Sequence, residues 1–328
     1  MRRFLLRRLA WFALTLWAVV TVSFVLMRSV RGGPFSAERS LPMEVEASLR
    51  ARYHLDWPLW KQYLAYLGPL ELGPRAPTFL GGDGSDPFGG VLAGDLGPSY
   101  KYRDFTVNDV LAQSLPISLA LGSVSLFFAV GLGVASGIVS ALRRGGFLDF
   151  ALRLLATLGI ALPNFVVASL AILLFAITFP VFPVAGWGSL RHLVLPGLAL
   201  GAPFAAYVSR LTRTGLVEVL SQDYVRTAVA KGLPPWLVLW RHALPAGCLP
   251  VLTYLGPATA GILTGSLVIE RIFAIPGTGS HFVNSALNRD YTLCMGVTIL
   301  YTVLVYALNT LVDLVSTWLD PRLSLEEA

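Results

Sequence analysis

The chain has 328 residues, of which 55% are apolar and only 13% are charged, against about 25% charged residues in soluble domains. This composition excludes a soluble globular protein and indicates a chain embedded in a membrane. The formal net charge is +6. Because basic residues collect at the inner surface of membrane proteins, we attribute the excess to that surface and not to a nucleic acid partner.

Six apolar runs are long enough to cross a bilayer, which takes roughly 18 to 20 residues of helix. We expect helices throughout, because a helix satisfies each backbone amide within its own segment and an open sheet does not. Proline and glycine interrupt several runs, as membrane helices tolerate where neighbours re-satisfy the freed groups. In chain order the predicted spans are 9–27, 114–142, 152–177, 193–211, 249–273 and 293–319.

The first run follows four arginines, as the apolar core of a signal peptide would. We reject a signal peptide because the run exceeds the roughly 7 to 15 residues of such a core, and no convincing pair of small residues marks a cleavage site after it. The run is therefore predicted to be a membrane helix.

Lysine and arginine in the short loops set the orientation. They gather at the N-terminus, near 143–153 and in the loop 210–245, which we place inside, whereas the connections 179–189 and 270–292 hold almost no unpaired basic charge and belong outside. An even number of spans returns the C-terminus to the inside. The stretch 31–109 then lies outside, with one or two amphipathic helices in its first half and a loop rich in Gly, Pro and Asp from 68 to 97.

The loop 210–245 is the most informative part of the chain, because it is polar and helix-prone between two spans. Asp223 is predicted to cap a helix that Gly232 ends in the left-handed conformation. Lys231 in the last turn favours the negative end of the helix dipole, and Pro234 opens a second short helix. Small residues let the backbone of another protein approach closely: Thr227, Ala228 and Ala230. The alternative is an ordinary amphipathic helix lying on the membrane surface.

Glycine pairs four residues apart punctuate the spans, at 133 and 137, 197 and 201, and 261 and 265. Such pairs let helices pack closely, and we prefer that role for the first two pairs. Gly261 and Gly265 line a substrate path or make a helix contact, since Thr264 and Ser266 add polarity beside them. At the outer end of the fifth span, Glu270 either bonds to the outer loop or touches a docked protein.

Enzymatic readings find little support. None of the three lysines follows a glycine, so a phosphate-binding P-loop is absent, and the four histidines form no zinc motif. Cys248 and Cys294 are predicted on opposite sides of the membrane, which argues against a disulfide or metal pair. A multispan membrane enzyme, such as an intramembrane hydrolase, requires a facing nucleophile and base, and no such pair is evident.

The spacing of the polar loop is x-x-Ala, three residues, Gly, nine residues, x-x-Leu-Pro, ending at Leu244 and Pro245. It resembles the loop by which bacterial ABC importers couple their membrane subunit to an ATPase. The sequence around it resembles the first permease subunit of oligopeptide and dipeptide importers. Further motifs of that family occur in order, among them Gly94-Asp95-Leu96-Gly97, Glu270-x-x-Phe273-x-x-Pro276-Gly277-x-Gly279, Arg289-Asp290-Tyr291 and Asp320-Pro321-Arg322. The departures are Arg226 for Glu of the wider loop, Val229 for Arg and Thr292 for Pro.

This resemblance implies an all-α integral membrane protein with the type I ABC importer permease fold: six transmembrane helices and an extracytoplasmic insertion after the first. Residues 1–105 would hold the first helix and the insertion, and residues 106–328 the five-helix core with the coupling loop 210–245. The resemblance further implies coupling to an ATPase through Asp223, Tyr224, Arg226, Thr227, Ala228, Ala230, Lys231, Gly232, Leu244 and Pro245. A path would be lined by Gly261, Thr264, Gly265 and Ser266, and a binding protein would be touched by Glu270, Pro276 and Gly277.

The implied partners are a second related permease, two ATPases that use ATP and Mg, an external solute-binding protein and membrane lipid. The implied location is the bacterial inner membrane, with both termini in the cytoplasm. This chain would bind no cofactor or metal and hydrolyse no ATP. The expected cargo is a di- or oligopeptide; the same machinery importing an oligosaccharide, a nickel chelate or glutathione remains the alternative.

Overall fold

The computed structural model describes residues 2–29, 43–68, 89–102, 105–263 and 267–319. Within these residues the structure is mainly helical, and strand-like pairing is limited to one isolated bridge between Pro98 and Thr106. The all-α architecture predicted from the apolar runs is thus confirmed for the described part of the chain.

Four helical segments are each long and apolar enough to cross a membrane. They are Leu6–Ser29 within α1 (Arg2–Ser29), α4 (Val107–Leu142), α7 (Arg191–Val219), and Tyr291–Leu311 within α14 (Tyr291–Leu319). Two bent helix pairs pass the same test, Phe147–Ala161 with Asn164–Thr178 and Pro235–Gly247 with Leu249–Leu263. If each pair is one span, the total is six, as the sequence predicted.

The third predicted span, 152–177, is broken by an angle of 111°. Helix α5 (Phe147–Ala161) ends at Leu162, whose ψ of 130° is extended, and α6 (Asn164–Ile172) starts after Pro163 and continues into the π-helix η3 (Leu173–Thr178). Proline lacks the amide hydrogen that a continuing helix needs and disfavours the helical conformation of the residue before it. The tolerated kink expected from the sequence is therefore a sharp turn.

The chain forms two compact units that interleave along the sequence. The first combines Met1–Ile117 with Pro276–Leu304, and the second combines Ser118–Ile275 with Val305–Ala328. The functional division between residues 105 and 106 stays a prediction.

In the first unit, α1 packs against α14 and against the short helix α3 (Leu59–Leu67), which follows α2 (Met43–Arg52). The buried cluster consists of Val20, Phe24, Tyr66, Met295 and Ile299. The two short helices lie where the sequence predicted one or two, and the predicted loop falls largely on residues 69–88, outside the described residues.

Buried Asp290 holds the start of α14 to the segment before α4. Its carboxylate accepts hydrogen bonds from the hydroxyl of Ser99 and from the backbone amide of Tyr100. Thr292, which replaces the usual proline, donates its hydroxyl to the carbonyl of Pro98 at 2.6 Å. The Arg-Asp-Tyr motif thus serves the internal structure of this unit.

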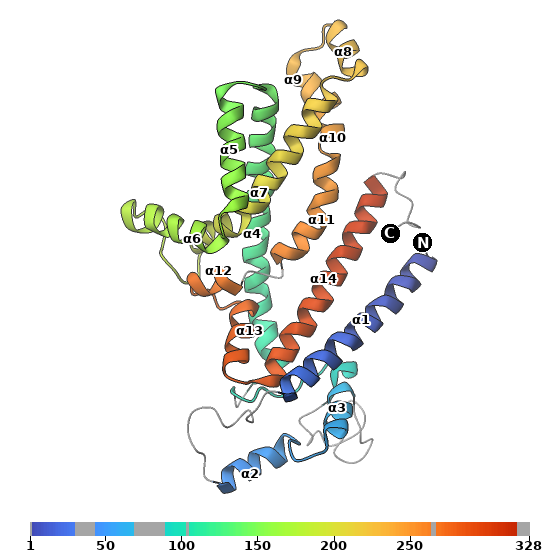
Figure 1. Cartoon of the computed structure of the whole chain (residues 1–328), viewed down its shortest axis with the longest axis vertical. Coiled ribbons are helices and arrows are strands. Elements are labelled where there is room, and N and C mark those ends of the chain that lie inside the picture. The colour runs from blue at the N-terminus through green and yellow to red at the C-terminus, as the bar shows by residue number, and fades with distance from the viewer. Residues whose placement is uncertain (1, 30–42, 69–88, 103–104, 264–266, 320–328) are drawn as a thin grey trace. The chain divides into compact units, whose positions relative to one another are not determined.

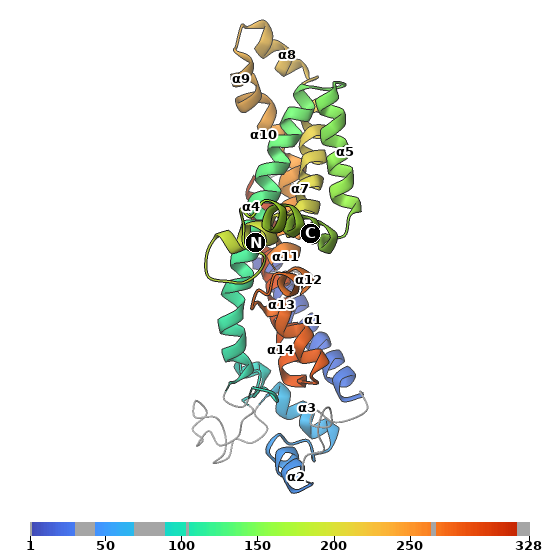
Figure 2. The same cartoon turned by 90° about the vertical axis from the view of Figure 1, so that its left-hand side faces the viewer.

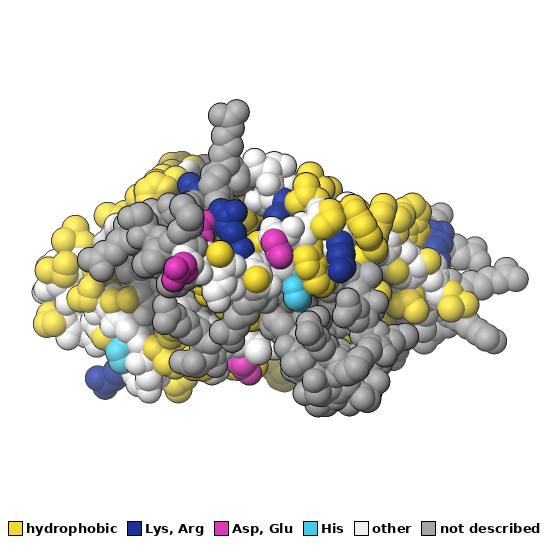
Figure 3. Space-filling model, turned by 90° about the horizontal axis from the view of Figure 1, so that it is seen from below, with side chains coloured by type: hydrophobic (Ala, Val, Ile, Leu, Met, Phe, Trp, Pro, Cys, Tyr) yellow, Lys and Arg dark blue, Asp and Glu magenta, His cyan; other side chains and the backbone are white. Residues whose placement is uncertain are grey.

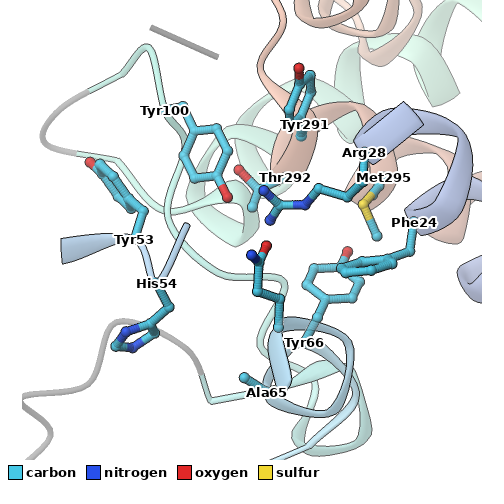
Figure 4. Close-up of a pocket in the computed structure, with 11 residues that line it drawn as sticks. Phe24, Arg28, Tyr53, His54, Ala65, Tyr66, Tyr100, Tyr291, Thr292 and Met295 are labelled. Carbon is cyan, nitrogen blue, oxygen red and sulfur yellow. The ribbon is translucent and has the colours of Figure 1, made fainter. Parts of the chain in front are cut away.

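A small cavity of about 20 Å³ lies among α1, α3 and α14, and Figure 4 shows the guanidinium of Arg28 extending toward the hydroxyl of Tyr100 beside it. The guanidinium also lies 5.5 Å from the ring centre of Phe24 and 5.7 Å from that of Tyr291. Burial raises the pKa of Tyr100 to about 12, although the positive charge of Arg28 opposes the shift, and burial raises the pKa of Tyr66 well above its ordinary value. Both phenols therefore stay neutral at physiological pH.

Charged side chains do not gather by sign on the face drawn in Figure 3. Where described side chains are visible there, acidic, basic and histidine side chains are scattered among apolar ones. This face, as far as it is described, offers no extended patch of one charge.

In the second unit, α4 and α5 pack on α7, and Figure 1 shows the three helices side by side. Glycines allow the close approach. A Cβ at Gly137 would lie 2.6 Å from Cβ of Thr212, and one at Gly201 would lie 2.6 Å from the carbonyl oxygen of Ser125. The helix-packing role predicted for the pairs 133/137 and 197/201 is confirmed.

The carboxylate of Asp149 ties the α4–α5 turn to α7. Arg213 donates two hydrogen bonds to it, at 2.7 and 2.9 Å, in a bidentate pair. Ser140 of α4 and the amide of Gly145 donate two more, at 2.6 and 2.9 Å. The carboxylate is almost fully buried, whereas Arg153 approaches it only at 3.4 Å from an exposed position.

Removing the bidentate partner of this buried carboxylate should destabilise the protein. We expect Arg213→Gln to lower the free energy of unfolding by about 3 kcal/mol, because it leaves a buried charge without its ion pair. The matched control is Arg153→Gln, which removes an exposed partner of the same carboxylate and should cost at most about 1 kcal/mol. Thermal melting of the purified protein in detergent measures both variants, and equal losses would contradict the assignment.

Candidate functional site

A helical excursion connects the end of α7 with α11 (Leu249–Leu263), and Figure 2 shows α8 and α9 projecting beyond the ends of α7 and α10. It consists of α8 (Asp223–Ala230), α9 (Pro235–Leu237), the π-helix η4 (Val238–Ala243) and α10 (Leu244–Gly247). We call residues 220–247 the arm. It contains every residue predicted to couple to an ATPase.

Helix α8 begins one residue earlier than the sequence predicted. Its N-cap is Gln222, without a side-chain cap hydrogen bond, and Asp223 is its first helical residue. The predicted capping role of Asp223 is therefore wrong. Its side chain is 99% exposed, and its negative charge in the first turn instead complements the positive end of the helix dipole.

The end of α8 agrees with the sequence. Gly232 has a φ of 78°, in the left-handed region, directly after the C-cap Lys231. A Cβ at Gly232 would meet no other atom within 4 Å, so only the backbone conformation demands glycine here. Pro234 is the N-cap of α9, at the predicted start of the second short helix.

One face of α8 is buried against the second limb of the arm, by which we mean α9 and η4, residues 235–243. Val225 and Ala228 pack on Val238 of η4. Ala228 is only 5% exposed, so its small side chain admits the neighbouring segment of its own chain, and not, as predicted, the backbone of another protein.

The opposite face of α8 is exposed and mostly polar. It presents Asp223, Arg226, Thr227, Ala230 and Lys231, with Val229 and the half-exposed Tyr224 as its larger apolar groups. Arg226 lies 3.5 Å from the carboxylate of Asp223, and the hydroxyl of Tyr224 donates to the carbonyl of His242 at 3.4 Å. We call this surface the outer face of α8; it is free, within this chain, to contact another protein.

The base of the arm rests on α7. Ala243, just before Leu244 and the exposed Pro245, is fully buried in a cluster with Leu216 of α7 and Ala141 of α4. One turn further, Gly215 of α7 meets the backbone of Gly247: a Cβ at Gly215 would collide with the carbonyl group of Gly247. Sequence reasoning missed this crossing, because neither Gly215 nor Gly247 has a second glycine four residues away and no paired spacing marks it.

The predicted path residues are described only in part. Gly261 lies on α11 with an exposed surface, and a Cβ there would make ordinary contact with the ring of Phe204 at 3.9 Å. Thr264, Gly265 and Ser266 lie outside the described residues. The path assignment therefore stays a prediction.

Glu270 of α12 (Leu267–Ile272) is fully buried, and its carboxylate accepts a hydrogen bond from Ser118 of α4 at 2.8 Å. This bond is internal to the chain, as one of the two weighed roles requires, but its partner lies on α4 and not in the outer loop. Pro276 is exposed, whereas Gly277 is buried as the N-cap of α13 (Thr278–Leu287). Contact with a binding protein at these positions stays a prediction.

The crossing of α7 and α10 should not tolerate a methyl group. We expect Gly215→Ala to lower the melting temperature by several degrees, because the new Cβ must displace the backbone of Gly247. Gly131→Ala is the control: Gly131 also lies inside a helix, but a Cβ there meets nothing within 4 Å. That variant should melt at the same or a higher temperature, since alanine is the better helix former.

Comparison with known proteins identifies the family. Residues 133–325 match the family described as the inner membrane component of binding-protein-dependent transport systems. Over 325 residues the chain is 42% identical to the oligopeptide transport system permease protein OppB of Escherichia coli (strain K12), covering 98% of this chain and 99% of the relative. It is 43% identical over 327 residues to the dipeptide transport system permease protein DppB of Bacillus subtilis (strain 168), covering 100% and 99%.

The fold is also found in a solved structure. A chain of the methionine ABC transporter MetNI, in an inward-facing conformation, superposes with a TM-score of 0.55 over 64% of this chain and 96% of that chain. At 17% sequence identity this likeness concerns the fold alone, and it confirms the predicted permease fold. Together with the family match and the nearly full-length relatives, the apolar helices show that this chain belongs to the multi-pass inner membrane components of binding-protein-dependent transport systems.

Proposed function

We propose that this chain is the membrane-spanning subunit of an ATP-driven importer of di- or oligopeptides. The observation that carries the cargo assignment is the 42 to 43% identity, along nearly the whole chain, to permeases named for oligopeptide and dipeptide transport. The partners in this proposal are a second related permease, two ATPase subunits that use ATP and Mg, and an extracytoplasmic binding protein. ATP hydrolysis belongs to the ATPases.

The outer face of α8 is the proposed contact with an ATPase. Its exposed polar groups suit a surface that another protein covers and releases in each cycle, while its buried face joins it to the rest of the arm. Asp223 and Arg226 supply charges of both signs. The short side chains of Thr227 and Ala230 let another protein approach the helix closely.

The contacts at the base of the arm link α8 to α7, so a movement of α8 is expected to move α7 as well. Val219 and Leu220, at the end of α7, pack under both buried clusters of the arm. Arg213 of α7 donates hydrogen bonds to Asp149 of α5, and α7 also contacts α4 at Gly137. A push on α8 is therefore expected to move α4, α5 and α7 together, which is the movement that alternating access requires.

The proposed orientation places the arm and both termini in the cytoplasm and the stretch 31–109 outside. The binding protein then meets the outer side, where the exposed Pro276 marks the proposed contact; Glu270 and Gly277, also predicted for it, are buried and could act only through their neighbours. The path between the two permeases is proposed to pass Gly261, Thr264, Gly265 and Ser266. Polar groups beside small ones suit a passage for a hydrated peptide backbone.

Gly232 tests the coupling role of the arm. Gly232→Val should strain the left-handed turn by about 1 kcal/mol or more and tilt α8. Loaded binding protein should then no longer stimulate ATP hydrolysis by the reconstituted complex, and uptake of a labelled tripeptide should fall, while the subunit remains inserted. Gly232→Asn is the control, because asparagine tolerates the left-handed conformation, and it should retain most of the stimulation.

Crosslinking shows whether an ATPase covers the outer face. A cysteine at exposed Thr227 should crosslink to an ATPase subunit, whereas one at its buried neighbour Ala228 should not. Normal transport by Gly232→Val, together with no crosslink from position 227, would make α8 a surface helix without a coupling role.

Cysteine labelling tests the orientation. In a background lacking Cys248 and Cys294, a cysteine at exposed Ser189 should react with an impermeant thiol reagent in intact cells, because the loop 179–189 is proposed to lie outside. A cysteine at exposed Ser221 should react only after the membrane is opened. Ser85, also suited to this test by the predicted topology, lies outside the described residues. Labelling of Ser221 in intact cells would invert the orientation.

A further inference from the structure

The second limb of the arm exposes two tryptophans that coupling through α8 does not use. Trp236 of α9 and Trp240 of η4 are 64% and 60% exposed. They are four residues apart and so lie on one side of the helical segment, while Val238 and Ala243 of the same segment are buried in the clusters that join it to α8 and α7. The limb therefore has an inner face that packs on its own chain and an outer face of indole rings.

The two outer faces of the arm differ in chemistry. The outer face of α8 carries a carboxylate, a guanidinium, a hydroxyl and an ammonium group. On the outer face of the second limb stand the two indoles, followed by the exposed Arg241. An indole is a large apolar surface with a single hydrogen-bond donor, which favours a place where one end is apolar and the other is wet.

The structure also indicates what covers the indoles. Pro235–Gly247 and Leu249–Leu263 pass together as one broken membrane span, bent by 53°. Trp236 and Trp240 thus stand in the first turns of a segment that is long and apolar enough to cross a membrane. Tryptophan is enriched where such segments meet the headgroups, and arginine beside it reaches anionic groups there.

We propose that Trp236, Trp240 and Arg241 form an interfacial anchor that holds the second limb of the arm in the headgroup layer of the inner leaflet. The inference rests on the cytoplasmic placement of the arm proposed above. In this arrangement the bilayer covers the second limb and an ATPase covers α8, so the two limbs have different partners although they share one buried cluster of Val225, Ala228 and Val238. The anchor fixes one limb while the other is pushed.

The test places an environment-sensitive fluorophore on a cysteine at position 236, with Trp240 kept, in the full complex in lipid nanodiscs. Lipids with a nitroxide on the headgroup should remove most of its emission, and lipids with a nitroxide deep in the acyl chain should remove little. Removal of the ATPase subunits from the complex should leave both results unchanged. The matched control is the same fluorophore at position 227 on α8. Headgroup nitroxides should quench its emission only weakly, and the ATPase subunits should cover it.

Two outcomes would overturn the anchor. In one, headgroup nitroxides leave the emission at position 236 unquenched; in the other, the ATPases shield that position from quenching, which makes the indoles part of the ATPase contact. A fluorophore at position 240 with Trp236 kept repeats the measurement if the first variant fails to assemble. Because position 227 reports the ATPase contact separately, a failure of the coupling proposal is seen there and leaves the result at position 236 interpretable.

Discussion

The second compact unit depends on the lack of side-chain volume where α7 crosses its neighbours. At Gly137 and Gly201 the backbones of α4 and α7 come close enough that no other residue fits, and at Gly215 the backbone of α7 meets that of α10. In a bilayer, helices gain little from burying apolar surface, because lipid tails are equally apolar, and close packing has to supply the association energy. The glycines therefore provide the contact that permits the other interactions of this unit.

Buried polar bonds fix the register that close packing leaves open. Backbone contacts alone would let two smooth helices slide, whereas a bidentate pair such as Arg213 with Asp149 forms at only one register. Ser118 with Glu270 does the same for α4 and α12. Each of these carboxylates is buried, so each depends on its partners to remain there.

The sequence predicted most of the helices, because crossing a membrane requires long apolar runs and permits little else. It also predicted the left-handed turn at Gly232, since a glycine after a polar helix has a specific local meaning. It failed where the outcome depends on neighbours distant in the chain. The burial of Ala228 is set by Val238, and the demand for Gly215 is set by Gly247, and neither follows from local spacing. The sharp break at Pro163 does not follow from the sequence, because a proline within an apolar run predicts an interruption but not how far the next helix turns.

The π-helix η4 gives the fixed spacing of the arm a geometric meaning. The nine residues between Gly232 and His242 include most of this wider helix, in which hydrogen bonds skip one residue more than in an α-helix. A return to ordinary α-helical winding can absorb the loss of one residue from η4, whereas the loss of one residue from α9 would rotate everything after it by about 100°. Ala243 and Gly247 would then leave α7, although neither was itself changed. Length outside η4 is thus constrained more strictly than composition, and relatives that keep the spacing while changing the side chains are expected to retain the same arm.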